Sequence, residues 1–367
     1  MQPYEPLAEV RKKLLIKWYR CPIEKQTLRV LTRRSDLKGW VYSGGNLAIL
    51  AATSFLTYYF FTKGIWIGFA VMLWVHGTIF AFIPGLATHE LSHGTVFKTK
   101  WLNGFFLRIY SLLGWVDFHH YKRSHTYHHL YTLHPEGDRE VVLPGNPSLK
   151  ALRILYVFTF NFTGFWYVLR NTVRLAILGK FSREWSDAIF PQEDKKGRQT
   201  AINWARMIFL FHVGVIVLSV LLQLWILPLL VTFGSFIGNW WKYFIGVTMH
   251  TGLQDNVPDF RKCCRTILLD PFSRFIYWNM NYHAEHHMFA AVPCYNLREL
   301  SRRIAWDMPR PRTLVGAWRE MRMVYRRQRK EPDYQYDTPV PQLEKEQKIA
   351  QDPIAASIGD LAPKALA

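Results

Sequence analysis

Long uncharged segments dominate the pattern of apolar and polar positions along this chain. Residues 64–88 form 25 consecutive positions without a charged side chain, and residues 207–241 form 35 more. Both exceed the ~18 apolar residues that are typical of a membrane-spanning helix. A shorter segment, 46–61, ends in the aromatic run YYFF, which is typical of the membrane interface. The pattern predicts an all-α integral membrane protein.

The longest uncharged segment is expected to cross the membrane twice. As one helix, residues 207–241 would be about 52 Å long, whereas the hydrocarbon core is about 30 Å thick. Pro228 offers a turn that would give spans at 207–225 and 229–249. With the two segments nearer the N-terminus, this predicts four transmembrane helices in two hairpins. Lys242, near the end of the last span, is expected to snorkel towards the membrane surface.

One further segment leaves the topology open. Residues 154–169 are uncharged and flanked by Arg153 and Arg170, but 16 residues are short for a span. We expect an in-plane helix at the interface. In a rival topology this segment spans the membrane and residues 207–241 form a single tilted helix. Both alternatives place the two termini on the same side.

The charge balance indicates a membrane surface as the partner. The chain carries 46 Lys and Arg against 27 Asp and Glu, a net charge of +19, which is typical of proteins that contact nucleic acid or anionic lipid. The uncharged segments favour the bilayer, so no nucleic acid partner is expected. Basic residues lie in the N-terminal arm, in 98–206 and after residue 260, which predicts a multi-pass protein with both termini cytosolic. The four cysteines include no CxxC pair, so no disulfide framework is expected.

Histidine is the residue type that carries the functional information. Ten of the 14 histidines fall in four short runs, which include HELSH, HTYHH and HAEHH. Spacings of i, i+3 and i+4 place side chains on one face of a helix, so each run is expected to direct its imidazoles to a common point. The candidate metal ligands and catalytic residues are His89, His93, His125, His128, His129, His250, His283, His286 and His287.

Nine imidazoles are more than one metal ion accepts. Two metals are therefore predicted, each with four or five nitrogen ligands, in a histidine-rich dimetal site held by a cytosolic helical cap. Carboxylates that orient the rings are expected among Glu90, Asp138, Asp255, Asp270 and Glu285. Structural roles are expected for His76, His119, His120 and His212, because isolated histidines near apolar segments are usually satisfied structural groups.

The three runs HELSH, HTYHH and NYHAEHHMF together resemble the membrane fatty-acid desaturase and hydroxylase superfamily, over roughly residues 40–300. The resemblance implies two irons on the cytosolic face of a four-span bundle, with O2 as co-substrate. It assigns the ligands to the three runs, and His250 corresponds to an additional ligand between the second and third.

The third run is most similar to desaturases and therefore favours desaturation of a lipid acyl chain. The alternative on the same site is hydroxylation of a lipid or another apolar small molecule. Because no electron-donor domain is recognised in the sequence, a separate donor of the ferredoxin, rubredoxin or cytochrome b5 type is expected.

The resemblance and the composition together divide the chain into four parts. Residues 1–39 form a basic cytosolic arm, 40–306 the desaturase-like membrane domain, and 307–330 a basic segment at the membrane surface. From residue 331 the sequence is rich in Pro, Gln, Glu, Asp and Ala, so 331–367 is expected to be a disordered tail.

Two other classes of protein compete with an oxidase. HELSH also matches the HExxH motif of zinc proteases, in which Glu90 would be the base and Asp270 a third ligand of an intramembrane enzyme. That alternative leaves most of the histidines unexplained. A non-catalytic metal-binding or transport protein would need polar groups within the spans, and only His76, His212 and Lys242 qualify.

Overall fold

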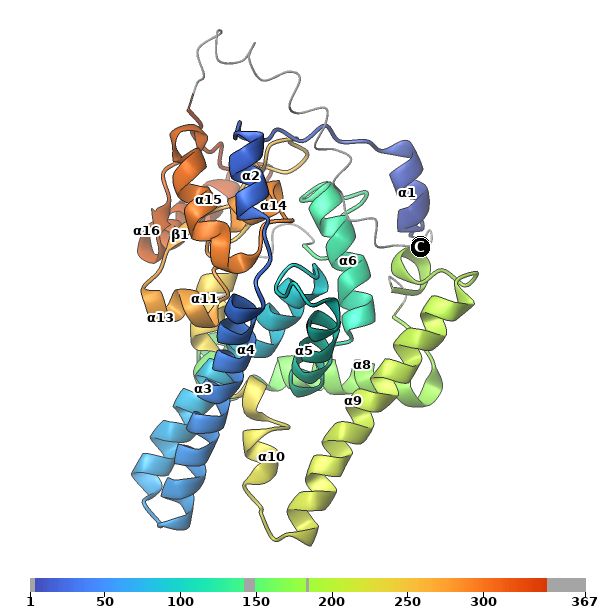
Figure 1. Cartoon of the computed structure of the whole chain (residues 1–367), viewed down its shortest axis with the longest axis vertical. Coiled ribbons are helices and arrows are strands. Elements are labelled where there is room, and N and C mark those ends of the chain that lie inside the picture. The colour runs from blue at the N-terminus through green and yellow to red at the C-terminus, as the bar shows by residue number, and fades with distance from the viewer. Residues whose placement is uncertain (1–3, 142–148, 183–184, 342–367) are drawn as a thin grey trace.

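The computed structural model describes residues 4–141, 149–182 and 185–341, which form a largely helical chain (Figure 1). The α-helices are α1 (Leu7–Lys13), α2 (Lys25–Leu31), α3 (Asp36–Thr62), α4 (Trp66–Ser92), α5 (Lys100–Leu113), α6 (Phe118–Tyr131), α7 (Ala151–Phe158), α8 (Phe162–Leu178), α9 (Lys195–Leu221), α10 (Leu227–Leu230), α11 (Trp240–Gly246), α12 (Phe260–Cys263), α13 (Pro271–Ile276), α14 (His283–Met288), α15 (Leu297–Ile304) and α16 (Leu314–Gln328). Shorter turns are the π-helical η1 (Trp185–Ile189) and the 3-10 turns η2 (Gly234–Phe236), η3 (Cys294–Asn296) and η4 (Ala305–Asp307). Strands β1 (Ile267–Leu268) and β2 (Arg312–Thr313) pair in parallel.

Two helices within the described ranges are long and apolar enough to cross a membrane. They are α4, with a mean hydropathy of 1.8, and α9, with 2.0. Helix α3 has the same length of 27 residues and forms a hairpin with α4 (Figure 1). On α3 the small and polar Ser43, Asn46 and Thr57 are buried while Phe55 and Leu56 are exposed. Small residues inside and apolar residues outside are typical of helices packed in lipid.

The long uncharged segment does fold back on itself. Helix α9 ends at Leu221, and α10 begins at Leu227 with Pro228 in its first turn. The rival topology with one tilted helix over 207–241 is therefore wrong. The returning segment is also not the continuous helix predicted for 229–249, because α10, η2 and α11 are separate pieces and Gly238 adopts a φ of 55°.

Side chains of α4 explain how an apolar segment can be broken. The carbonyl of Leu230 accepts a hydrogen bond from His76 Nε2 at 2.9 Å, and that of Gly238 accepts one from Thr78 Oγ1 at 2.9 Å. Non-helical backbone at membrane depth is tolerated only where its polar groups are satisfied within the protein. A hydropathy pattern reports the apolar composition of the segment but cannot reveal these hydrogen bonds from α4.

The segment predicted as one interfacial helix, 154–169, is also broken. Helices α7 and α8 flank a gap at which the Asn161 side chain accepts a hydrogen bond from Gly164 N and so begins α8. The backbone N–H of Asn161 donates to Phe236 O at 2.8 Å, so this break pairs with the break in the returning segment. The prediction of a single helix over residues 154–169 is therefore wrong. In Figure 1, α8 lies across the direction of α9.

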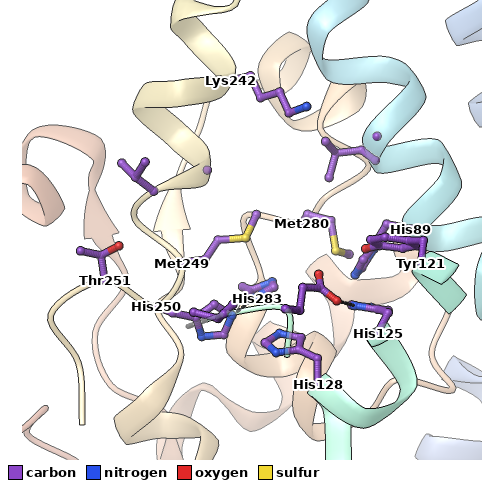
Figure 2. Close-up of a pocket in the computed structure, with 16 residues that line it drawn as sticks. His89, Tyr121, His125, His128, Lys242, Met249, His250, Thr251, Met280 and His283 are labelled. Carbon is purple, nitrogen blue, oxygen red and sulfur yellow. Dashed lines mark hydrogen bonds and ion pairs between the residues drawn. The ribbon is translucent and has the colours of Figure 1, made fainter. Parts of the chain in front are cut away.

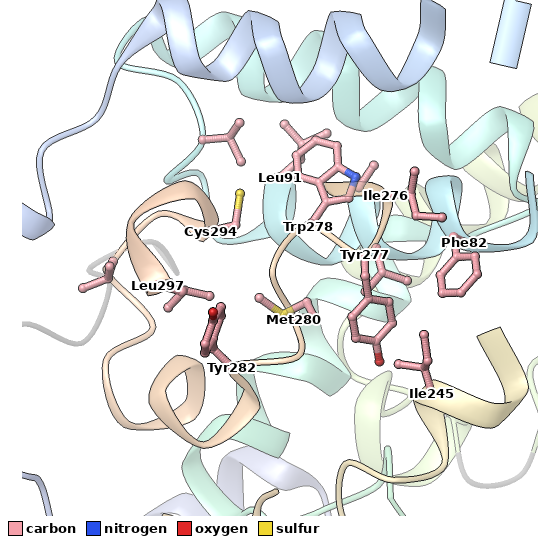
Figure 3. Packing of buried hydrophobic residues seen from close by; sticks show 14 of the residues in the cluster. Phe82, Leu91, Ile245, Ile276, Tyr277, Trp278, Met280, Tyr282, Cys294 and Leu297 are labelled. Carbon is pink, nitrogen blue, oxygen red and sulfur yellow. The ribbon is translucent and has the colours of Figure 1, made fainter. Parts of the chain in front are cut away.

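The main hydrophobic core lies between α4, α5 and the C-terminal helices (Figure 3). Its largest members include Phe82, Tyr277 and Trp278, which are at most 1% exposed. Helix α16 adds the buried Ala317, and Trp318 Nε1 donates to Phe244 O at 2.8 Å. The segment predicted to lie on the membrane surface thus packs against the protein.

Part of the predicted disordered tail is ordered. Tyr336 N donates to Gly252 O at 2.9 Å, Lys262 pairs with Asp337, and Thr338 is 3% exposed. These contacts fold residues 331–341 back onto the loop after α11, because this short stretch offers hydrogen-bonding and charged partners that composition alone does not reveal. Residues 342–367 lie outside the described residues.

Candidate metal centre

All nine candidate ligands come together beneath the C-terminal helices. They are supplied by the end of α4, by α6, by the loop that follows α11 and by α14. Helix α6 begins at Asp117, whose side chain accepts hydrogen bonds from two backbone N–H groups of its first turn. Every residue of α14 is buried, so protein surrounds this helix and all three of its histidines lie in the interior.

The ligand atoms form two spatial groups. The five-histidine cluster consists of His89, His93, His125, His129 and His286, and the four-histidine cluster consists of His128, His250, His283 and His287. Within each cluster one nitrogen atom per residue lies within 4.8 Å of the others. Four or five imidazole nitrogens at such spacing are a donor set that suits iron, zinc, copper or nickel.

Each histidine run of α6 and α14 is divided between the two clusters. His125 and His129 belong to the five-histidine cluster, whereas His128 of the same run belongs to the other. Helix α14 reverses this, because only His286 of its run joins the five-histidine cluster. The expectation that each run directs its imidazoles to one common point is therefore wrong.

The separations between ring nitrogens fit bound metal ions. Nε2 of His125 lies 3.2 Å from Nε2 of His93 and 3.0 Å from that of His129, and Nε2 of His283 lies 2.8 Å from that of His250. A metal–nitrogen bond of about 2.1 Å places two ligand atoms at right angles about 3.0 Å apart. The nitrogen atoms thus have the mutual spacing of ligands that share one ion.

Several rings are fixed through their other nitrogen. Three rings donate from Nδ1 to a carboxylate: His89 to Glu90 Oε1 at 3.0 Å, His125 to Glu140 Oε2 at 2.9 Å, and His128 to Asp138 Oδ2 at 2.8 Å. Two others donate from Nδ1 to a neutral oxygen: His250 to Cys263 O at 2.9 Å, and His287 to Thr132 Oγ1 at 3.0 Å. A proton on Nδ1 leaves the Nε2 lone pair free, which is the arrangement of metal-ligating histidines.

Two of the expected carboxylates, Glu90 and Asp138, hold histidines, and three do not. Glu285 accepts from Thr266 and Ser301, Asp270 caps α13, and the backbone N–H of Asp255 donates to Gln335 Oε1. The sequence analysis missed Glu140. Its position two residues after Asp138, in the segment that follows HTYHH, is the signal that would have found it.

His286 shows most directly that the site is built for a ligand. The residue is 0% exposed, and neither ring nitrogen has a hydrogen-bond partner among the described residues; its Nδ1 is 3.7 Å from Glu90 Oε1. A buried polar group without a partner costs about 1–3 kcal/mol. A metal ion bound at Nε2 would remove that cost.

Burial keeps most of these rings in the neutral form that binds metals. It lowers the pKa of His125, His129 and His283 well below the usual range, and neighbouring histidines lower it further. His128 differs: burial lowers its pKa, but the Asp138 and Glu140 carboxylates together outweigh burial and raise it.

A cavity of about 290 Å³ opens beside the two clusters (Figure 2). Histidines of both clusters line one part of it, together with Tyr121, whose ring stacks on His125 with centroids 5.1 Å apart. Leu86, Met249 and Met280 line another part. The arrangement would place an apolar molecule next to the imidazoles.

The four histidines predicted to be structural lie outside both clusters: His76, His119, His120 and His212. In α4, His76 bonds to the carbonyl of Leu230, and in α9, His212 bonds to that of Leu112 at 3.0 Å. Both are engaged by backbone groups, so two of the three polar groups that a transport function would need already have structural partners.

The zinc protease alternative does not agree with this geometry. Asp270 is at the start of α13, outside both clusters, and accepts hydrogen bonds from Phe272 N and Ser273 N. Glu90 is 0% exposed and holds a ligand ring, so it does not face a cavity as a general base would. HELSH instead supplies His89 and His93 to the five-histidine cluster.

The fold and site define a helical membrane protein with a buried, histidine-lined centre for metal ions. The family model described as fatty acid desaturase matches residues 65–317, which is more than half of the sequence. The chain therefore belongs to the fatty acid desaturase family, as the three histidine runs indicated. A comparison with curated proteins finds no match. Family membership identifies the chain as an oxidoreductase, and the two clusters fit a diiron oxidase.

Proposed function

We propose that this protein is a membrane-bound non-haem diiron oxidase that desaturates a lipid acyl chain, using O2 and two electrons from a separate donor. The observation that carries the proposal is the pair of histidine clusters: nine imidazoles, seven buried and two half-buried, converge beside an apolar-lined cavity. The nine histidines would hold the two irons, five in one cluster and four in the other.

The choice of iron rests on the family, since imidazole ligands alone also suit zinc, copper and nickel. When bound, the iron pair would supply the oxygen chemistry that breaks an unactivated C–H bond, which acidic and basic side chains cannot do. The chain itself holds the rings in place through Glu90, Glu140 and Asp138, and surrounds the substrate with apolar side chains.

Desaturation converts a CH2–CH2 unit, O2, two electrons and two protons into CH=CH and two molecules of water. Hydroxylation, the alternative on the same site, yields an alcohol and one molecule of water. The two outcomes differ in whether a second hydrogen is removed before oxygen is transferred. The desaturase-type third run, NYHAEHHMF, favours the alkene.

The electrons must enter from the protein surface. The half-buried Trp18 stacks on Phe260 with ring centroids 4.0 Å apart, and Phe260 lies 5.6 Å from the ring of His287 in the four-histidine cluster. This row of rings supports an electron route from the N-terminal arm. The positive charge around it favours an acidic donor, such as a ferredoxin, rubredoxin or cytochrome b5.

We further propose that α3, α4, α9 and the broken return segment 227–249 all pass through the bilayer. The metal centre and both termini would then face the cytosol. The basic N-terminal arm and the basic segments between and after the hairpins support this orientation. Cysteine labelling at Lys63, between α3 and α4, and at Lys100, which begins α5, would report opposite sides of the membrane.

The decisive experiment combines metal analysis with lipid analysis. The full chain, purified in detergent from iron-supplied cells, should contain about two irons and give the Mössbauer spectrum of a coupled pair. The expressing host should accumulate unsaturated lipid, and a His125→Ala variant should not. One zinc and no iron would refute the oxidase, whereas hydroxylated lipid would replace desaturation by the alternative reaction.

A further inference from the structure

Lys242 is the one lysine among the described residues that lines the cavity beside the histidine clusters. It was expected to snorkel to the membrane surface, but Figure 2 shows its side chain pointing from α11 into the space towards α4. The amine fits there because residue 85 is glycine: a Cβ at Gly85 would lie 3.3 Å from Lys242 Nζ.

No described residue gives this amine a hydrogen bond or an ion pair. Among the residues that line the cavity, the one carboxylate is Glu140, and its Oε2 already accepts from His125 Nδ1. An ionisable side chain within an apolar bundle is costly and is normally paired. The lysine therefore has the position of a binding group whose partner arrives with a ligand.

The wall between this amine and the metal centre is apolar. Leu86, Val247, Met249 and Met280 contribute to it, and in Figure 2 the two methionines lie between Lys242 and the histidines. A volume of 290 Å³ corresponds to about ten atoms of the size of a water molecule. The cavity thus accepts a chain of moderate length with an apolar body and one polar end.

We propose that Lys242 binds the anionic oxygen group, a carboxylate or a phosphate, of a substrate whose apolar chain extends towards the histidine clusters. This inference rests on the proposed oxidase function and adds a class of substrate to it. Lys242 is then a specificity-determining residue: the distance from its amine to the clusters sets which carbon of the chain lies at the metal centre.

Binding of short amphiphiles to the full-length protein tests this inference without turnover. The probes are radiolabelled decanoate, decyl phosphate and decanol, and the proteins are wild type, Lys242→Met, Lys242→Arg and a matched control, Lys63→Met, at an exposed lysine between α3 and α4. We expect Lys242→Met to weaken binding of at least one anionic probe by about 10- to 100-fold, as loss of a charged hydrogen bond does.

Lys242→Arg should retain most of that binding, while decanol should bind all four proteins alike. A preference for decanoate would identify a fatty acid, and a preference for decyl phosphate a phosphate-bearing lipid. Anionic probes that bind Lys242→Met as tightly as wild type, or that fail to bind wild type, would overturn the inference. Iron content is measured on the same samples: Lys242-dependent binding without iron would refute the oxidase alone, and two irons without such binding would refute only the role of Lys242.

Discussion

Removal of the Glu140 carboxylate should weaken one metal site and spare the other. Its Oε2 accepts the Nδ1 proton of His125 at 2.9 Å, and no other side-chain contact of Glu140 is seen with the described residues. The side chain is 27% exposed, so Glu140→Ala should leave the fold intact. Loss of such a partner typically costs 10- to 100-fold in metal affinity. That range corresponds to about 1.4–2.8 kcal/mol.

Anaerobic titration of the iron-loaded protein with a chelator measures this effect. In Glu140→Ala, one of the two irons should leave at a 10- to 100-fold lower chelator concentration than in wild type. Glu140→Gln keeps an acceptor without the charge and should lie between the two. Glu136→Ala, at an exposed acid in the same segment, is the control. Equal weakening of both irons would refute the assignment of His125 to a separate cluster, and no change in either would refute the role of Glu140 in holding His125.

Other predictions concern the ligands, the fold and the electron route. His286→Ala should reduce iron from about two to about one per chain by elemental analysis; retention of both would exclude His286 as a ligand. Asp307→Ala removes a buried carboxylate that pairs with Arg261 and accepts a hydrogen bond from Tyr19, while Arg261 keeps its ion pair with Asp259. We therefore expect a loss of about 1–3 kcal/mol in the free energy of unfolding, and chemical denaturation that shows no loss would contradict this. Trp18→Leu should slow reduction of the loaded protein by its donor in stopped-flow experiments while iron content stays unchanged, and an unchanged rate would rule out the Trp18 route.

That the nine histidines come together could be predicted from the sequence, but their grouping could not. The spacing of HTYHH predicts that its three histidines lie near one another on a helix, and all three do lie on α6. Adjacent residues of a helix, however, point about 100° apart around its axis. His128 and His129 therefore diverge, and the neighbouring helices decide which cluster each one joins. Such information lies in the approach of α4, α6 and α14, not in any one segment.

Hydropathy was informative where a helix meets lipid and misleading where it meets protein. It located α4 closely, because that segment is apolar throughout and forms one helix. It failed in the return segment, where an equally apolar stretch is divided into α10, η2 and α11 and Gly238 adopts a φ of 55°. It also failed for Lys242, which a membrane pattern assigns to the surface but which lines the cavity. Lys242 lies beside the proposed site, where local rules give way to function.

The two clusters form one structural unit because they share helices α6 and α14. Each helix contributes to both, and Asp138 and Glu140, two residues apart, hold a ring in each: His128 in the four-histidine cluster and His125 in the five-histidine cluster. A displacement of this segment would therefore disturb both clusters at once. Two independent metal sites would not need shared helices, whereas a reaction that draws on both metals requires their separation to be fixed. The shared elements thus favour a paired centre acting on one substrate in the adjoining cavity.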